Sequence, residues 1–208
     1  LTSYPQDMTA RIIEAVAALP TVCESFSLPV QAGHDDVLQA MHRGYSLAEY
    51  YDTITRVRRL MPEAGITTDV IVGFPGETDE QFEATCGLLK ELRFDKVHVA
   101  AYSPRPGTIA FRKLADDVPD IVKKARLQRV EQIQERIATE INAQLLGQTI
   151  DVLVEGLGEK DGRPHGRTRA AKIVHLDGAA QPGDLVPAYI EKTSPWSLQG
   201  SQVQWSLI

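Results

Sequence analysis

Five polar or charged side chains of this 208-residue chain lie at or just after the ends of predicted strands. Ligands of open α/β sheets and of barrels bind just past the carboxyl ends of parallel strands. There an arginine can pair with a ligand carboxylate through two hydrogen bonds, and glutamine and serine can hydrogen-bond hydroxyls or ring nitrogens. The residues that share this predicted rim are Gln31, Arg43, Glu77, Ser103 and Arg105.

Each of these residues also has an ordinary structural interpretation. Arg43 can cap the carbonyls of a helix end, Gln31 can face water in a turn, and Ser103 can be a plain loop residue. No set of nucleophile, base and orienting group can be picked out from sequence order alone. The histidines, which show no metal-ligand spacing, are read as surface or structural residues. They are His34, His42, His98, His165 and His175.

The segment 69–78 is the stretch around which the chain is organised. The run at residues 66–74 is rich in β-branched and apolar residues, which predicts a strand covered on both faces. Gly73 and Gly76 let the backbone approach a ligand closely, and Thr78 with Gln81 predicts a capping box that begins a helix. The same residues are also compatible with a tight strand-to-helix turn without a ligand.

Two further strands, at residues 26–30 and 96–102, are likewise followed by polar or glycine-containing turns. Three such strands with helices between them predict parallel strands joined by right-handed crossovers, as in part of a TIM-like barrel. A second capping box is predicted at Ser46 and Glu49, with Tyr45 and Tyr50 as its hydrophobic staple.

The second half of the chain follows different patterns. Residues 119–146 predict one long amphipathic helix with Val130 and Ile137 inward and Lys and Arg on its outer face, ended by Gly147. Short alternating runs separated by Gly, Pro and Asp then predict a small antiparallel β-barrel. We therefore expect a partial barrel at 1–117, a connecting helix at 118–146 and a β-barrel domain at 147–208.

Composition narrows the class of protein. The chain is 43% hydrophobic and 24% charged, as is usual for a globular domain, and it has no apolar run long enough for a membrane span. Cys23 and Cys86 stand far apart, which favours reduced thiols over a disulfide framework. A net charge of −6 argues against indiscriminate coating of nucleic acid. We expect a cytoplasmic protein without a membrane partner.

A basic cluster with one aromatic residue marks the β-barrel domain. Basic and aromatic residues on a small barrel can bind phosphates and stack on bases, which predicts an RNA-binding surface. The alternatives are a solvated charged hairpin and a Trp196 that plugs the barrel against the long helix. The predicted RNA-binding residues are Arg105, Lys160, Arg163, Arg167, Arg169, Lys172 and Trp196.

Four motifs in order resemble the methylthiotransferases of the radical S-adenosylmethionine (SAM) superfamily. They are Leu-Pro-Val-Gln-Ala-Gly at 28–33, Met-His-Arg-Gly-Tyr at 41–45, Thr-Asp-Val-Ile-Val-Gly-Phe-Pro-Gly-Glu-Thr at 68–78 and Tyr-Ser-Pro-Arg-Pro-Gly-Thr at 102–108. The last 60 or so residues, with Gly-Arg-Thr-Arg at 166–169 and Ser-Pro-Trp-Ser-Leu at 194–198, resemble a TRAM domain. Within the family the motifs resemble the MiaB type, which acts on tRNA, more closely than the RimO type, which acts on a ribosomal protein.

The resemblance implies an enzyme that methylthiolates isopentenyl-adenosine at position 37, beside the tRNA anticodon, with SAM as radical source and methyl donor. The partners implied are the tRNA anticodon stem-loop, SAM and an N-terminal half of the same enzyme. The family has Ser-Gly-Ser where this chain has Ala-Gly-His at 32–34. By analogy the SAM site is lined by Gln31, Arg43, Gly73, Phe74, Pro75, Gly76, Glu77, Tyr102 and Ser103.

The CxxxCxxC motif that binds the radical-generating 4Fe-4S cluster in this family is absent from the sequence. A cluster needs thiolate ligands, and two distant cysteines do not replace that motif. We therefore expect a C-terminal half of a longer enzyme with two 4Fe-4S clusters, inactive by itself and with no catalytic or metal-ligating residue of its own. The alternatives are a non-catalytic RNA-binding fragment and a methylthiotransferase that acts on a ribosomal protein or on another modified tRNA adenosine.

Overall fold

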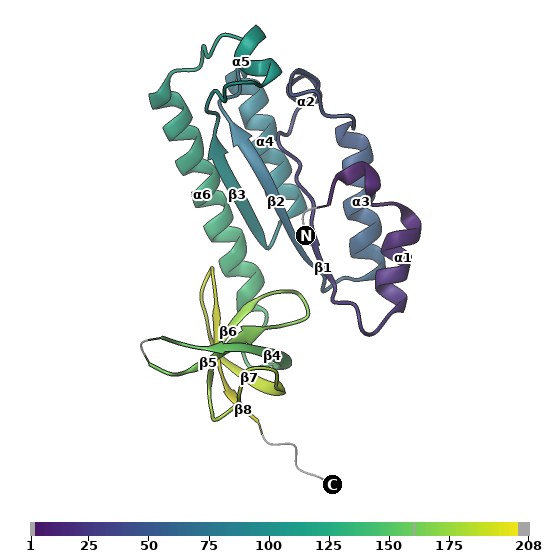
Figure 1. The fold of residues 1–208 in the computed structure, drawn as a ribbon, viewed down its shortest axis with the longest axis vertical. Helices are drawn as coiled ribbons and strands as arrows, with labels where there is room; N and C mark the ends of the chain where they lie inside the picture. The colour runs from purple at the N-terminus through teal and green to yellow at the C-terminus, as the bar shows by residue number, and fades with distance from the viewer. Residues whose placement is uncertain (1–2, 160, 204–208) are drawn as a thin grey trace.

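The computed structural model describes residues 3–159 and 161–203, which form an α/β part and a β-barrel part joined by one long helix (Figure 1). The elements in chain order are η1 (Pro5–Asp7), α1 (Ala10–Ala18), β1 (Ser25–Ser27), α2 (Asp35–Ala40), α3 (Leu47–Leu60), β2 (Gly65–Val72), α4 (Asp79–Leu92), β3 (Lys96–Ala101), α5 (Ile109–Lys113), α6 (Asp120–Ala143), β4 (Thr149–Leu157), β5 (Pro164–Arg167), β6 (Ile173–Asp177), β7 (Leu185–Thr193) and β8 (Leu198–Gln202). Lys160 lies outside the described residues. None of the described helices is long and apolar enough to cross a membrane.

The sheet of the α/β part is parallel, as the strand, turn and helix pattern predicts, with the order β1-β2-β3. Strand β1 is shorter than predicted, because the chain leaves the ladder after Ser27 and rejoins it only through a bridge between Gln31 and Val70. Pro29 has no N–H to donate, and the N–H of Val30 donates to Thr68 Oγ1 at 2.9 Å instead of to a strand carbonyl.

The prediction that β2 is covered on both faces is wrong. Every second residue from Ile66 to Val72 is buried, whereas the residues between them are only half-buried. Thr67 and Asp69 place polar atoms on that second face, so the strand has the period of two of a half-covered sheet. Figure 1 shows α4 behind the sheet, with β2 and β3 in front of it.

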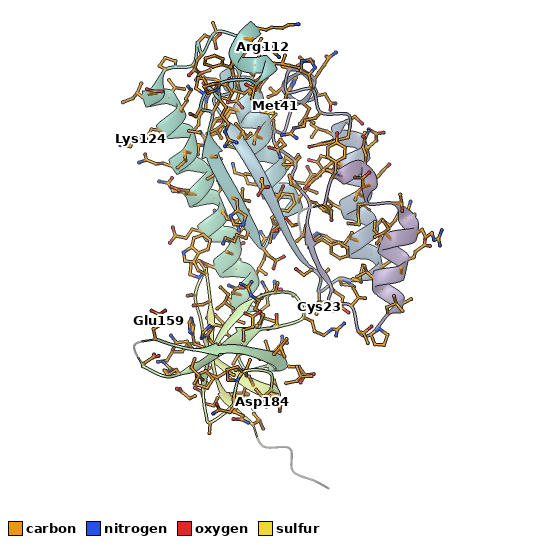
Figure 2. The ribbon with its side chains drawn as sticks, in the orientation of Figure 1. Cys23, Met41, Arg112, Lys124, Glu159 and Asp184 are labelled. Atoms are coloured by element: carbon orange, nitrogen blue, oxygen red, sulfur yellow. The ribbon has the colours of Figure 1, made fainter. Side chains whose placement is uncertain are left out.

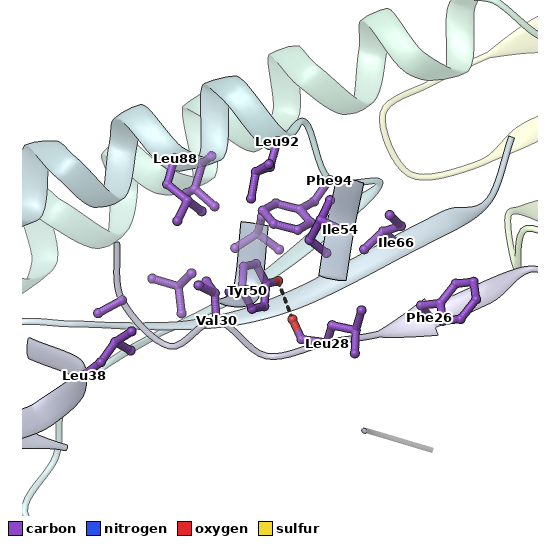
Figure 3. Close-up of a cluster of buried hydrophobic side chains, with 14 of the residues drawn as sticks. Phe26, Leu28, Val30, Leu38, Tyr50, Ile54, Ile66, Leu88, Leu92 and Phe94 are labelled. Carbon is purple, nitrogen blue, oxygen red and sulfur yellow. Dashed lines mark hydrogen bonds between the residues drawn. The ribbon is translucent and has the colours of Figure 1, made fainter. Parts of the chain in front are cut away.

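Helices α3 and α4 supply much of the core of the α/β part. Both predicted capping boxes are present, at Ser46 with Glu49 and at Thr78 with Gln81. Tyr50 is fully buried on α3, and its hydroxyl donates a 2.7 Å hydrogen bond to the carbonyl of Leu28 (Figure 3). The side chains that surround it in Figure 3 include Val30, Ile54, Leu88, Leu92 and Phe94.

Helix α6 runs along β3 and reaches the β-barrel, but its buried face differs from the prediction. Val130 and Ile137 are buried as expected. Lys123 and Arg126, which we placed on the outer face, are buried as well. The buried side chains of α6 follow one another at helical spacings of three, four, seven and eight residues, and they include both apolar and polar residues. Its buried polar members are Lys123, Arg126, Gln134 and Asn142.

The second part is a closed five-stranded barrel with the order β4-β5-β6-β8-β7. Strand β5 falls in the basic segment that the sequence analysis did not assign to a strand, and β6 and β8 pair in parallel in an otherwise antiparallel barrel. Gly166 permits this closure, because a Cβ there would lie 2.0 Å from the carbonyl oxygen of Leu153. The barrel core is Val152, Val154, Val174, Leu176, Ala180, Val186, Ala188, Ile190 and Leu198.

We expect Tyr50→Phe to lower the free energy of unfolding by about 1 kcal/mol, because a buried hydroxyl that bonds a carbonyl is lost. The matched control is Tyr51→Phe. The Tyr51 hydroxyl bonds the exposed carboxylate of Glu91, so its loss should lower the free energy of unfolding by less than half as much. Urea unfolding of both variants measures the difference. Equal effects of the two substitutions would contradict the role given to the Tyr50 hydroxyl.

Candidate functional site

The carboxyl ends of β1, β2 and β3 open onto one rim, where the predicted ligand-binding residues were expected. Gln31 is 8% exposed and has φ 69°, a left-handed conformation that is uncommon for a residue with a Cβ. Its N–H and carbonyl bond Asp69 and Ile71 of β2, so the backbone conformation is held by the neighbouring strand. Because the neighbouring strand holds this uncommon conformation, the backbone of Gln31 has a fixed position on the rim.

The turn after β2 depends on the glycine at its start. Gly73 has φ 69°, and a Cβ there would lie 2.4 Å from Lys123 Cγ on α6. Its N–H donates to Glu77 Oε2 at 2.6 Å, and the N–H of Gly76 donates to Asp117 Oδ1 at 2.7 Å. Both the conformation and the close approach of the lysine therefore require glycine at position 73.

Glu77 forms a buried ion pair at the base of this turn. Its Oε2 lies 2.8 Å from Arg126 Nη1, and the two side chains are 1% and 6% exposed. Burial raises the pKa of Glu77 above its ordinary value, against the lowering effects of the Gly73 N–H and of Arg126. Arg126 also bonds Asp79 at 2.8 Å and lies over the ring of Phe82.

The position of the Glu77 carboxylate oxygens decides whether this residue can contact SAM directly, as predicted. Its Oε2 is used inside the turn, and its Oε1 is buried without a hydrogen-bond partner in the part of the chain that the structure describes. The side chain therefore shapes the turn from within, and the residues of the turn that can meet a ligand are those whose atoms face outward. Pro75 is half-buried and Gly76 is exposed.

The aromatic residues of the β2 and β3 ends pack against each other. The rings of Phe74 and Tyr102 are 5.1 Å apart in an edge-to-face arrangement, and Lys123 Nζ lies 5.6 Å from the centre of the Tyr102 ring. Lys123 pairs with Asp116 at 2.5 Å. Lys123 was not predicted as a site residue, although it lies seven residues before Val130 and so on the face of the helix predicted to point inward. The neighbouring Lys124 is exposed.

Arg43 lies on the loop between α2 and α3 and, like Arg126, carries a buried donor that is unsatisfied in the described part of the chain. Its Nε is buried and has no hydrogen-bond partner among the described residues. Figure 2 places Met41, two residues before it, at the same end of the molecule as Arg112 of α5. A buried guanidinium N–H without a partner favours an anionic ligand, so the residue fits the carboxylate of SAM.

The other residues near the rim are exposed, bond to the backbone of neighbouring residues, or pack closely against it. Ser103 and Arg105 are exposed on the loop before α5, and the carbonyl of Arg105 accepts hydrogen bonds from Thr108. His34 caps α2 by accepting a bond from the N–H of Asp36. Gly33 lies so close to Thr85 that a Cβ would meet its Cα at 2.4 Å.

The described residues do not fit an iron-sulfur cluster. No group of three His, Cys, Asp or Glu side chains in the described part of the chain could hold a metal ion. Cys23 is exposed before β1, and Cys86 is buried in α4, where burial raises the pKa of its thiol. A thiol that is harder to ionise is a poorer metal ligand.

The basic cluster of the β-barrel divides into two groups in the structure. Arg163 pairs with Asp177 and Arg167 pairs with Glu155, all within the barrel and at least one-third exposed. Arg169 and Lys172 instead point at the α/β part, where they pair with Glu24 and Asp95. Their guanidinium and ammonium groups are occupied there, so these two residues do not present the free cations that RNA binding was predicted to use.

Trp196 is 53% exposed, so its ring does not plug the barrel. The turn that carries it is held by bonds between Ser194 and Ser197, and Asn142 of α6 donates to the carbonyls of Ser194 and Pro195 at 2.7 and 3.2 Å. The turn is therefore docked on the helix, while the indole remains available for stacking on a base.

Comparisons with known proteins divide the chain in the same way. Residues 1–89 match the family model of the Radical SAM superfamily, and residues 143–203 match the TRAM domain. The structure of coproporphyrinogen III oxidase (HemN) from Escherichia coli, described as a radical SAM enzyme, has a TM-score of 0.55 and 16% identity, and covers 92% of this chain and 46% of that chain. At this identity the likeness shows the fold alone.

Two curated relatives carry the name tRNA-2-methylthio-N(6)-dimethylallyladenosine synthase. The one from Chloroflexus aurantiacus is 51% identical over 204 residues, which cover 96% of this chain and 43% of the relative. The one from Dehalococcoides mccartyi strain CBDB1 is 46% identical over 204 residues, which cover 98% and 48%. The chain thus spans a little under half the length of the curated relatives it matches.

We expect Arg126→Met to lower the free energy of unfolding by about 3 to 5 kcal/mol at neutral pH, because it leaves the buried Glu77 carboxylate without its cation. Removal of that cation raises the pKa of Glu77 further. A carboxyl whose folded pKa is raised destabilises the fold as the pH rises through that value, so the deficit should shrink as the pH falls toward the unfolded pKa of Glu.

The control is Arg129→Met, which breaks the exposed pair with Glu83 between the same two helices and should cost below about 1 kcal/mol at any pH. Denaturant unfolding at several pH values distinguishes the two variants. A pH-independent deficit in Arg126→Met would show that Glu77 is not the group left uncompensated.

Proposed function

We propose that this chain, which joins a radical SAM segment to a TRAM domain, is the carboxy-terminal half of a tRNA methylthiotransferase. The observation that carries this proposal is the identity of 51% over 204 residues to a tRNA-2-methylthio-N(6)-dimethylallyladenosine synthase. The matched residues run through both domains. The substrate inferred from it is a tRNA whose N6-dimethylallyl-adenosine lies at position 37, next to the anticodon.

The whole activity belongs to a protein about twice as long as this chain, since the relatives extend beyond the matched half. SAM, when bound, supplies the radical and the methyl group. The cluster ligands are proposed to come from the remaining half, because Cys23 and Cys86 do not provide them. The role left to the described residues is to bind and orient SAM and tRNA.

The rim residues are suited to hold SAM in three ways. Arg43 has a buried donor that lacks a partner within residues 3–159 and 161–203, and this donor fits the carboxylate. The turn after β2 offers backbone at close range at Gly76, which is exposed and has open space where a Cβ would stand. Gln31 and Tyr102 flank the turn from the neighbouring strand ends and can contact the ribose and the base.

Direct proof requires the chain joined to the missing half, with both clusters reconstituted. The product to be measured by mass spectrometry is 2-methylthio-N6-dimethylallyladenosine in tRNA. A ribosomal protein and a tRNA with a different modified adenosine serve as competing substrates. Modification of either in preference to dimethylallyl-adenosine would refute the assignment, and a fully loaded enzyme that modifies none would favour a purely RNA-binding role.

In that longer protein we expect Arg43→Ala to weaken SAM binding about tenfold to a hundredfold, the loss of one hydrogen bond to a charged group. The control is Arg112→Ala, an exposed arginine on α5 at the same end of the molecule (Figure 2). Calorimetric titration with SAM measures both. Unchanged affinity in Arg43→Ala, or equal loss in the control, would remove Arg43 from the site.

We expect the chain by itself to bind tRNA weakly and with a salt dependence of roughly −1.5 to −2.5 in log K against log salt, as for two or three phosphate contacts, because Arg169 and Lys172 are occupied. Arg167→Ala should flatten this slope by about one unit for every tRNA, since phosphates carry no sequence information. Trp196→Ala should weaken binding by about 1 to 3 kcal/mol and leave the slope unchanged, because stacking releases no counterion.

The control for these titrations is Arg11→Ala, an exposed arginine on α1 outside the barrel, which should change neither quantity. No binding at low salt, or a slope in Arg167→Ala equal to that of the unmodified chain, would leave the barrel cations as an ordinary solvated surface.

A further inference from the structure

The loop between β5 and β6, residues 168–172, touches the start of every strand of the parallel sheet. Arg169 bonds Glu24 just before β1, Ala170 lies against Gly65 at the start of β2, and Lys172 bonds Asp95 just before β3. These contacts join residues up to 145 positions apart in the sequence. One short loop of the barrel therefore meets the amino end of the sheet, opposite the rim described above.

Arg169 makes the most specific of these contacts. Its Nε and Nη2 donate to the two oxygens of Glu24 at 2.8 and 2.9 Å, the paired geometry of an arginine with a carboxylate. Its Nη1 and Nη2 also donate to the carbonyls of Pro20 and Val22 at 2.9 and 2.6 Å. The hydrogen bond from Arg169 holds the pKa of Glu24 below its ordinary value. A lysine could not reproduce this set of directions.

The second contact is a close backbone approach. A Cβ on Gly65 would lie 2.1 Å from the carbonyl oxygen of Ala170, so only glycine allows the loop to come this near. Ala171 has φ 60°, and this left-handed residue turns the chain back toward Lys172. Ala171 directly follows the residue that approaches Gly65, and its N–H donates to the carbonyl of Thr168 within the loop.

Lys172 completes the contact at the third strand and at α6. Its Nζ lies 2.5 Å from Asp95 Oδ1 and 2.8 Å from Asn142 Oδ1, and the side chains of the lysine and the aspartate are 13% and 14% exposed. The other oxygen of Asp95 accepts the N–H of Ile66, and the amide of Asn142 holds the turn before Trp196. One buried cation thus joins the sheet, the long helix and the barrel.

We propose that residues 168–172 form an interdomain clamp, and that Arg169 is a positioning residue that fixes the barrel relative to the SAM-binding rim. The clamp lies at the amino end of the sheet and the rim at its carboxyl end. The eight residues of β2 separate the two by about 23 Å. A tRNA held by the barrel has to span that length to reach the rim, so a fixed domain orientation sets where the target base arrives. This consequence for RNA rests on the proposed function, whereas the clamp itself does not.

Hydrogen exchange on the 208-residue chain tests the clamp without RNA. In Arg169→Ala, amides of residues 21–24 and 168–172 should exchange about tenfold faster or more, because the bonds that hold both segments are lost. Amides of the barrel strands β4 and β7 should keep their protection. The matched control is Arg163→Ala, which removes an arginine paired with Asp177 inside the same barrel.

A second variant changes Glu24, the partner of Arg169 in the α/β part. Glu24→Gln removes the charge that Arg169 binds and leaves the barrel sequence intact, and it should speed exchange in the same two segments. The double variant should add little to Arg169→Ala, which already removes the bonds to Glu24, Pro20 and Val22. Unchanged exchange in Arg169→Ala and Glu24→Gln, or an equal change in Arg163→Ala, would overturn the clamp.

A salt titration with tRNA separates positioning from a direct phosphate contact. If Arg169 only positions the barrel, Arg169→Ala keeps the salt slope of the chain, whereas a phosphate contact would flatten it by about one unit and overturn the assignment. In the longer protein, kcat/KM for tRNA should fall in Arg169→Ala while the tRNA dissociation constant stays within about twofold. If the chain by itself binds no tRNA, the barrel cations are an ordinary solvated surface, and the exchange experiment still decides the clamp. The proposed function fails separately, if the longer protein modifies no tRNA.

Discussion

The buried ion pair between Glu77 and Arg126 is the interaction on which the arrangement of the α/β part depends. It ties the turn after β2 to helix α6, and the same carboxylate accepts the N–H of Gly73, so turn and helix fix each other. Lys123, one turn earlier on α6, packs its stem against Gly73 and pairs with Asp116. Each ion depends on the other, because removal of either would leave a buried charge without its counter-ion. Glu77 Oε1 and Arg126 Nε are buried without a hydrogen-bond partner among the described residues. The shape of the rim therefore depends on a helix that contributes no atom to the predicted ligand contacts.

The rest of α6 extends this constraint toward the barrel. Gln134 donates to the carbonyls of Phe94 and Asp95 at 3.1 Å, at the turn that enters β3. Asn142 bonds both the Trp196 turn and Lys172. An apolar stripe tolerates small rotations of a helix, whereas directional bonds at successive levels permit one register. The buried polar side chains of α6 thus bond the turn at the rim, the turn before β3 and the barrel, so one helix links the positions of the rim and the barrel.

Much of the fold follows from local sequence signals. The two capping boxes depend on residues close together in the chain, and the parallel pairing of the strands follows from their alternation with helices. The structure contains both features. The directions of charged side chains depend on partners far away, and there the sequence was a poor guide. Lys123 and Lys124 are adjacent and equally basic, yet only the first is buried, because the helix turns it toward Gly73. Likewise Arg167 and Arg169 are alike in sequence, but only the second meets a carboxylate of the other domain.

The division of the basic cluster also limits how the barrel can hold RNA. Arg163 and Arg167 remain outside the interface, but each already pairs with an acidic residue. A phosphate that binds either arginine therefore replaces a carboxylate as its partner. Exposed pairs of this kind contribute little, so the exchange costs little, but its net gain is correspondingly small. Affinity from the barrel alone should then rest on Trp196 as much as on charge, and tight binding of tRNA requires further contacts along the 23 Å or so between barrel and rim.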